Sequence, residues 1–150
     1  MRRAIAQARE GIAHGQTPFG SCIVRDGRVV AAEHNAVWGT TDSTAHAEVQ
    51  AIRAACRALA TVDLSGSVIY STCEPCPMCF SAIHWAKIST IVFGARIADA
   101  QVLGFSELTI PNETMKRQGR SAVEIVPDFL RDECLALFGE FAARPDRRMY

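Results

Sequence analysis

Two short stretches of the chain hold residue types that bind metal ions and move protons. In "HAEVQAI", His46 and Glu48 stand two apart, and in "CEPCPMC", Cys76 and Cys79 stand three apart. Residues three apart on a helix lie about 60° from each other around its axis, so both sulfur atoms can reach one metal ion. A CxxC pair alone also fits a redox dithiol, half of a four-cysteine zinc site or two core cysteines. The remaining cysteines contain no CxxC pair of their own, so the motif needs one or two further ligands.

His46 is able to complete this ligand set. Residues two apart on a helix point about 200° from each other, so His46 and Glu48 can meet only beyond the N-terminus of their helix. Cys76 follows Pro75 at the expected start of a second helix, where the positive end of the helix dipole stabilises a thiolate. Three protein ligands leave a fourth tetrahedral position to water, which is typical of catalytic rather than structural zinc. We therefore predict Zn2+ bound by His46, Cys76 and Cys79.

Glu48 is the candidate catalytic residue. A carboxylate beside metal-bound water can take its proton and pass it to a leaving group. The other histidines, His14, His34 and His84, have no partner at ligand spacing. His84 follows Cys79 by five residues, about 140° around the helix, and so is expected to face elsewhere.

The composition indicates one domain, residues 1–150, of a soluble globular protein. Apolar residues make up 49% of the chain, and sixteen basic residues balance sixteen acidic ones. No apolar run approaches the roughly 20 residues needed to cross a bilayer, and the first residues lack a secretion signal, so we expect a cytoplasmic protein with reduced thiols. Cys22, Cys56 and Cys134 are expected in the core, and Cys73 in the core or on the pocket floor. With a net charge of zero, the chain lacks the excess of basic residues that is typical of a nucleic-acid-binding protein.

Helical and strand-like periods alternate along the chain. Ile5, Ala8 and Ile12 recur at helical spacing, and Asp26-Gly27 predicts a hairpin between two β runs of residues 20–35. Further helices are expected at residues 46–59, 76–87 and 129–141, and further strands at residues 67–72, 90–94 and 122–126.

The ends of two helices also have predicted caps. Ser43 or Thr44 is expected to cap the first of the three later helices, and Asp128 the last.

Residues 98–121 show neither a helical nor a strand-like period. The alternation predicts an α/β sandwich around a mixed sheet whose central strands are parallel.

The motifs "TPFGSCIV", "HAEVQAI" and "CEPCPMC" resemble the cytidine deaminase superfamily across residues 17–94. H-x-E followed by P-C-x-x-C is the signature of the zinc deaminases. The resemblance implies a three-layer α/β/α sandwich with a five-stranded mixed sheet, and hydrolytic deamination of a nucleobase or related heterocycle. It also implies that the protein forms a homodimer or a larger assembly. Its substrate is expected to be a small molecule, and no membrane is expected to take part.

Three longer stretches, "TAHAEVQAIRAAC", "STCEPCPMCFSAIHWAK" and "DAQVLGF", are most similar to bacterial guanine deaminases. That resemblance implies conversion of guanine to xanthine and ammonia. It further implies that Asn35 hydrogen-bonds the purine, that the backbone N–H of Ala47 holds a ring carbonyl, and that Trp85 helps to form the pocket. Tyr150 would close the pocket as part of a lid in its own subunit or a neighbour's. Asn35 could instead be a turn residue, Trp85 a packing residue, and Tyr150 the end of a frayed tail.

Other functions stay open at this point. Residues 121–141 read more like the end of tRNA adenosine deaminases and fungal cytosine deaminases, so adenosine in tRNA, cytosine or a nucleoside are alternative substrates. The neutral charge weighs against tRNA. An inactive, zinc-bearing interaction protein is a further alternative, but such a protein has no use for a carboxylate like Glu48 beside an open metal position.

Overall fold

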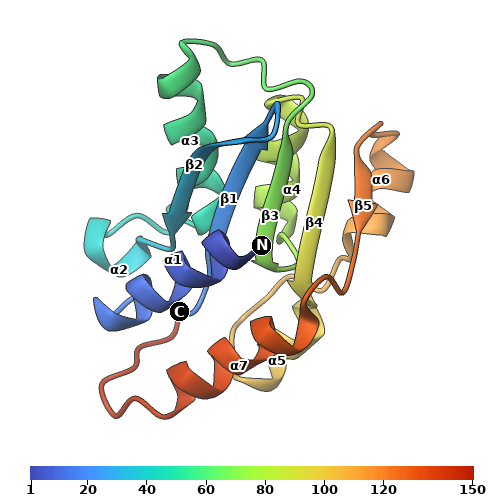
Figure 1. The fold of residues 1–150 in the computed structure, drawn as a ribbon. Helices are drawn as coiled ribbons and strands as arrows, with labels where there is room; N and C mark the ends of the chain where they lie inside the picture. Colours follow the sequence, from blue (N-terminus) through green and yellow to red (C-terminus); the bar gives the residue numbers. More distant parts are fainter.

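The computed structural model describes residues 1–150 and is built around one five-stranded sheet (Figure 1). Its strands are β1 (Gly20–Arg25), β2 (Arg28–His34), β3 (Val68–Cys73), β4 (Thr90–Ala95) and β5 (Glu124–Val126), in the spatial order β2-β1-β3-β4-β5. β1 pairs antiparallel with β2 and β3, whereas β3, β4 and β5 are parallel. The predicted mixed sheet with parallel central strands is confirmed.

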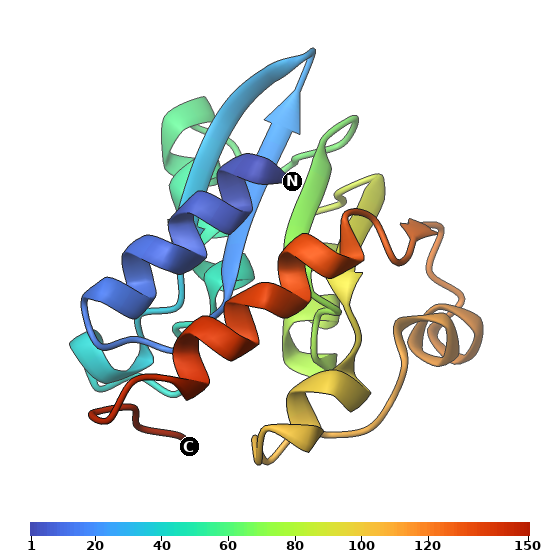
Figure 2. The same ribbon diagram turned by 60° about the horizontal axis from the view of Figure 1, so that its bottom comes forward.

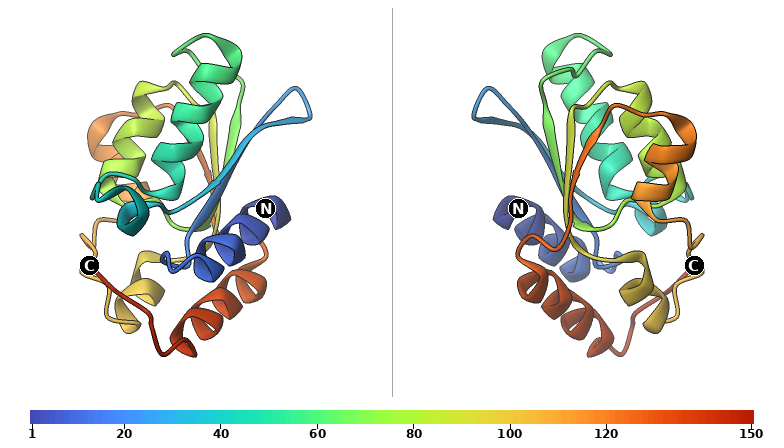
Figure 3. Two further views of the ribbon diagram at one scale, coloured as in Figure 1. Left: turned by 90° about the vertical axis from the view of Figure 1, so that its left-hand side faces the viewer. Right: turned by 90° about the vertical axis from the view of Figure 1, so that its right-hand side faces the viewer.

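Helices cover both faces of the sheet. α1 (Arg2–Ala13) and α7 (Arg131–Ala142) lie across one face, which Figure 2 shows from the front. α3 (Ala47–Leu59) and α4 (Pro77–Trp85) lie on the other face, with α6 (Asn112–Gly119) beside α4 (Figure 3). Two short helices, α2 (Val37–Thr40) and α5 (Ile97–Val102), complete the three-layer sandwich.

Each face of the sheet has its own apolar core. Ile23, Ile69 and Ile91 belong to the core that packs against α3 and α4, while Cys73 and Ala95, the last residues of β3 and β4, belong to the second core. The latter core joins α1 to α7 and includes Cys134. Cys22 and Cys134 are buried as predicted, and Cys56 is half-buried.

The hairpin between β1 and β2 has the predicted turn. Asp26 and Gly27 both have positive φ, 50° and 71°, which is the conformation of a type I′ turn. The two predicted helix caps are wrong. The N-cap residue of α3 is His46, and Thr44 is instead held in a local turn by the carboxylate of Asp42. The N-cap residue of α7 is Leu130, and the carboxylate of Asp128 pairs with Arg96.

The stretch that fitted neither period, residues 98–121, contains most of α5 and all of α6. Short helices show too few turns for a clear apolar period, which explains why no helix or strand was predicted for these residues. The segment that joins them, residues 103–111, runs beside the N-terminus of α4. None of the helices combines the length and the apolar character needed to cross a membrane.

Gly20 lies where α1 approaches the sheet most closely. A Cβ atom at this position would stand 2.1 Å from the carbonyl oxygen of Ala4 and 2.6 Å from the backbone nitrogen of Ala8. Since backbone atoms cannot rotate away, we expect Gly20→Ala to lower the free energy of unfolding by about 1–3 kcal/mol, measured by urea denaturation.

Gly139 supplies the matched control for this substitution. It lies within α7 with no atom within 4 Å of an added Cβ. Gly139→Ala should therefore raise stability by about 0.5–1 kcal/mol, because alanine loses less conformational freedom in a helix. A Gly20→Ala protein as stable as the wild type would contradict the close approach of α1 to β1.

Candidate metal centre and active site

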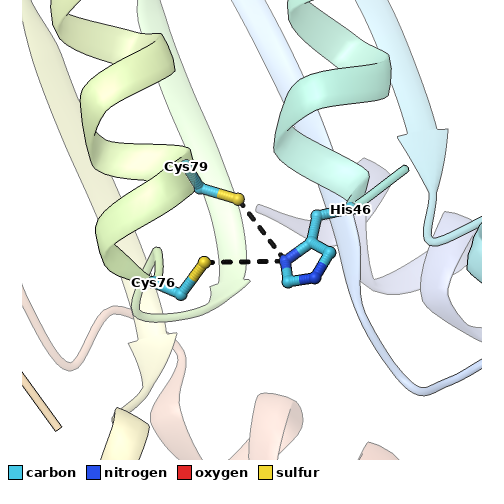
Figure 4. Close-up of side chains that lie close together, drawn as sticks. All are labelled: His46, Cys76 and Cys79. Atoms are coloured by element: carbon cyan, nitrogen blue, oxygen red, sulfur yellow. Dashed lines mark hydrogen bonds between the residues drawn. The ribbon is translucent and has the colours of Figure 1, made fainter. Parts of the chain in front are cut away.

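Two helix N-termini meet at one point of the molecule. His46 is the N-cap residue of α3 and Cys76 is the N-cap residue of α4, both with extended backbone. Neither side chain makes a capping hydrogen bond to its own helix, and Pro77 at the first position of α4 is preorganised for the helix start. Both side chains therefore project off the helix ends toward each other (Figure 4).

His46, Cys76 and Cys79 form a compact ligand set. The Nδ1 atom of His46 lies 3.6 Å from Sγ of Cys76 and 3.5 Å from Sγ of Cys79. All three ligand atoms lie within 4.8 Å of one another. Tetrahedral zinc, with Zn–S bonds of about 2.3 Å and Zn–N bonds of about 2.1 Å, places sulfur and nitrogen ligands about 3.6 Å apart. The spacing and the donor types both fit Zn2+, as the sequence predicted.

The electrostatics of the two thiols favour a cation at this point. Hydrogen bonding with Cys79, and then with His46, lowers the pKa of Cys76 to about 4. The same bond raises the pKa of Cys79, which is also fully buried. Burial lowers the pKa of His46, but the hydrogen bond with Cys76 and the charge of Glu48 outweigh it, so the net shift is upward. A bound divalent cation deprotonates its thiol ligands and removes this competition for protons.

Glu48, the second residue of α3, lies beside the ligands. Its side chain is buried, accepts a hydrogen bond from the hydroxyl of Ser71, and has Oε2 3.4 Å from Sγ of Cys79. Burial raises the pKa of this carboxyl group, while the charge of His46 and the bond from Ser71 oppose the rise. A carboxylate with a raised pKa in a dry site is suited to accept a proton and return it.

A cleft of about 230 Å³ opens above the metal ligands. Its lining includes the ligands His46 and Cys76, together with Phe105, Glu107 and Tyr150. Two larger hollows, of about 460 and 340 Å³, lie elsewhere along β4 and β5 and contain none of the three ligands.

Glu107 is a site residue that the sequence analysis did not predict. It lies in the segment between α5 and α6 and lines a small inner hollow together with His46, Glu48 and Cys73. Burial raises the pKa of its carboxyl group, as does the charge of Cys76. The only sequence signal was an acidic residue within a long stretch without a clear period. Cys73 belongs to the apolar core, as predicted, and also borders this hollow.

Tyr150 reaches the site from the far end of the chain. After α7 the chain runs past the end of the sheet to the side that carries α3 and α4 (Figure 3). The Tyr150 hydroxyl accepts a hydrogen bond of 2.8 Å from Nδ2 of Asn35, and its ring centroid lies 5.9 Å from that of His46. Tyr150 therefore lies in the site of its own chain.

Trp38 of α2 holds the same tail. Its indole nitrogen donates to the carbonyl oxygen of Arg148 at 3.3 Å, and the Arg148 guanidinium stands 4.6 Å from the centroid of the ring. Sequence reasoning did not single out Trp38, because its role depends on a contact between residues more than a hundred positions apart.

The other predicted substrate residues differ in their positions. Asn35 is fully buried at the end of β2, where Oδ1 accepts a bond from the backbone of Val37. Ala47 begins α3, so its N–H belongs to the helix start between His46 and Glu48. Trp85 is 81% exposed, nine residues and about 13 Å along α4 from Cys76, so it does not form the pocket of its own chain.

Known proteins share this arrangement at the level of sequence and fold. A family model described as the cytidine and deoxycytidylate deaminase zinc-binding region matches residues 1–95. Guanine deaminase from Bacillus subtilis strain 168 is 43% identical over 117 residues, which cover 77% of this chain and 75% of that protein. The tRNA-specific adenosine deaminase of the same organism is 33% identical over 141 residues, covering 94% and 85%. A solved structure of guanine deaminase from Nitrosomonas europaea superposes with a TM-score of 0.86 at 30% identity, covering 94% of this chain and 81% of that one.

The ligand set generates a prediction about metal content. Elemental analysis after dialysis should find about one zinc ion per chain, and His46→Ala, Cys76→Ala and Cys79→Ala should each lose it, because two ligands hold zinc too weakly. Glu48→Gln should keep its zinc, because Glu48 neighbours the ligands without belonging to them.

Cys56→Ala is the matched control, since it removes a thiol from the same helix that begins at His46. It should keep full zinc content. Retention of zinc by Cys79→Ala would contradict the assignment of that ligand.

Proposed function

This chain belongs to the cytidine and deoxycytidylate deaminase family, and we propose that its substrate is free guanine, which it hydrolyses to xanthine and ammonia. Relatives named as guanine deaminase and as tRNA-specific adenosine deaminase are both similar to it, so family membership gives a zinc-dependent hydrolytic deaminase and leaves the substrate to be argued from the site.

The observation that carries the proposal is the position of Tyr150. Its side chain bounds the cleft above His46 and Cys76, and Trp38 and Asn35 hold the tail there. The remaining volume of about 230 Å³ is below the range of about 300–1,000 Å³ that drug-sized ligands occupy. A single heterocycle suits such a cleft, whereas a nucleotide within an RNA loop needs an entrance for its sugar and flanking phosphates.

The polar groups around the cleft match guanine. Guanine carries a ring N–H next to an amino group, and both donate hydrogen bonds. The half-buried carboxylate of Glu107 offers acceptor oxygens on the side of the cleft. The N–H of Ala47 and the phenol of Tyr150 supply donors for a ring carbonyl or ring nitrogen.

Glu48 performs the proton transfers in this proposal. When bound by His46, Cys76 and Cys79, zinc supplies a Lewis acid that activates water at neutral pH. Glu48 accepts a proton from the attacking water and delivers it to the amino nitrogen, which leaves as ammonia. The hydroxyl of Ser71 holds the carboxylate in place, and burial keeps bulk water away from it.

A second candidate substrate is adenosine in tRNA. The alignment with the tRNA-specific adenosine deaminase extends over 94% of this chain and so includes the C-terminal region. Balanced charge, sixteen basic against sixteen acidic residues, argues for a small neutral substrate. Assembly as a homodimer and a cytoplasmic location stay predictions.

The substrate can be tested by ammonia release from guanine, guanosine, cytosine, cytidine, adenine, adenosine and tRNA. We expect guanine to give the highest kcat/KM, with turnover nearly independent of salt between about 50 and 200 mM, because no phosphate contacts are lost. Zinc-loaded Glu48→Gln is the matched control and should be at least about a hundredfold slower. If activity on tRNA depends steeply on salt and free bases are not deaminated, the substrate is adenosine in tRNA and not guanine.

The role of the tail can be tested by truncation. Deleting residues 147–150 removes Tyr150 and the contact of Arg148 with Trp38, so kcat/KM for guanine should fall at least about tenfold, about 1.4 kcal/mol of transition-state stabilisation. Zinc content and melting temperature should stay near wild-type values, since the removed residues are mostly exposed. Arg147→Ala is the control within the tail, because the Arg147 side chain bonds only to the carbonyl of Arg144. Equal kcat/KM for the truncated and full-length proteins would show that Tyr150 has no role in substrate binding or catalysis.

A further inference from the structure

Glu74 stands between the last residue of β3 and the metal ligand Cys76, and it bonds to two helices at once. Its Oε1 accepts a hydrogen bond of 2.8 Å from the backbone N–H of Asn112, and its Oε2 accepts one of 3.3 Å from that of Ile97. Ile97 is the first residue of α5 and Asn112 the first residue of α6. One carboxylate therefore satisfies a free N–H group at the start of each helix.

Asn112 reinforces the same junction from the opposite direction. Its side chain is fully buried, and Nδ2 donates a bond of 2.6 Å to the carbonyl oxygen of Pro75. The backbone N–H of Glu74 also donates to the carbonyl of Ala95 at 2.8 Å, which ties it to the end of β4. The two residues that precede Cys76 are thus fixed to β4 and to the starts of α5 and α6.

The segment between these two helices carries Glu107. Residues 103–111 leave the end of α5 and return at the start of α6, so the bonds of Glu74 restrain the chain on both sides of the segment. Glu74 and Glu107 also border the same inner hollow as His46 and Glu48. No side-chain hydrogen bond of Glu107 itself holds it in place, so its position depends on how its segment is anchored.

We propose that Glu74 is a positioning residue for substrate binding, which fixes Glu107 at a set distance from the metal ligands. The inference rests on the proposed function, because that function assigns Glu107 to binding the base. Glu74 touches no substrate in this arrangement and acts through the segment that it anchors. A carboxylate with only a capping role would stabilise α5 and α6 without any energetic link to Glu107.

Hydrogen exchange measures the anchoring directly. In zinc-loaded Glu74→Ala, amide exchange across residues 97–112 should rise at least about tenfold, while α3, α4 and zinc content remain unchanged, because both accepted bonds are lost. Amide exchange across the same residues should rise less in Glu74→Gln, since the amide oxygen of glutamine can still accept a hydrogen bond from the backbone N–H of Asn112. Asp63→Ala is the matched control, because Asp63 holds the backbone and hydroxyl of Ser65 in a turn away from the site. Unchanged exchange in residues 97–112 would overturn the proposal.

A double-mutant cycle separates positioning from capping. Glu74→Ala should lower kcat/KM at least about tenfold, mostly through KM, and Glu74→Gln should recover part of the loss. In a Glu107→Ala background the same Glu74→Ala change should cost less than about twofold, because the group that it positions is gone. Equal losses in both backgrounds would overturn the proposal.

The same experiments distinguish failure of this inference from failure of the proposed function. A wild-type protein that does not deaminate guanine removes guanine as the substrate, and the cycle is then measured on the substrate from the panel that is deaminated. If Glu74→Ala does not fold, Glu74→Gln carries both the exchange measurement and the cycle.

Discussion

The structure depends on two helices that begin at the same place with metal ligands as their N-cap residues. At most helix starts, a serine, threonine, asparagine or aspartate side chain turns back to satisfy a backbone N–H. Here His46 and Cys76 occupy those positions and point outward. The positive ends of two helix dipoles are therefore directed at one point, where they stabilise thiolates and the carboxylate of Glu48. The parallel arrangement of α3 and α4 on one face of the sheet makes this possible.

Concentrating buried polar groups at one point costs stability that the rest of the fold offsets. The apolar cores on the two faces of the sheet fix the helices that carry the ligands, and α3 packs on β1 and β2 through small residues such as Ala51 and Ala55. The ion pairs between α1 and α7, from Arg2 to Glu133 and from Arg9 to Glu140, are exposed and contribute little. Rigidity at the metal centre therefore comes from packing, while the tail and residues 105–108 line the cleft beside it.

The sequence predicted the parts of the site whose geometry follows from local chain structure. The spacing of His46, Glu48, Cys76 and Cys79 determines their directions once the helices are placed, so the ligand set was predictable. The same rule places Trp85 about 120° around α4 from Cys79, away from the cleft of its own chain, which agrees with its exposed position. Ser43 and Thr44 were wrongly predicted as caps because a metal ligand takes that position. Glu107 and Trp38 could not be predicted, since their roles arise from contacts between distant segments without a periodic signal.

The residues of the site divide between the part of the chain that matches the family and the part beyond it. The ligands and Glu48 all lie within residues 1–95, the part that matches the family. Glu107 and Tyr150 lie beyond it, on segments that reach the cleft after the sheet is nearly complete. The metal ligands and Glu48 thus precede the end of β4, and the residues that line the cleft beyond β4 contribute no metal ligand. Glu74 connects the two parts, because it lies within residues 1–95 and bonds to Ile97 and Asn112 beyond them. Its two hydrogen bonds therefore join the residue next but one before Cys76 to the starts of α5 and α6, on either side of the segment that carries Glu107.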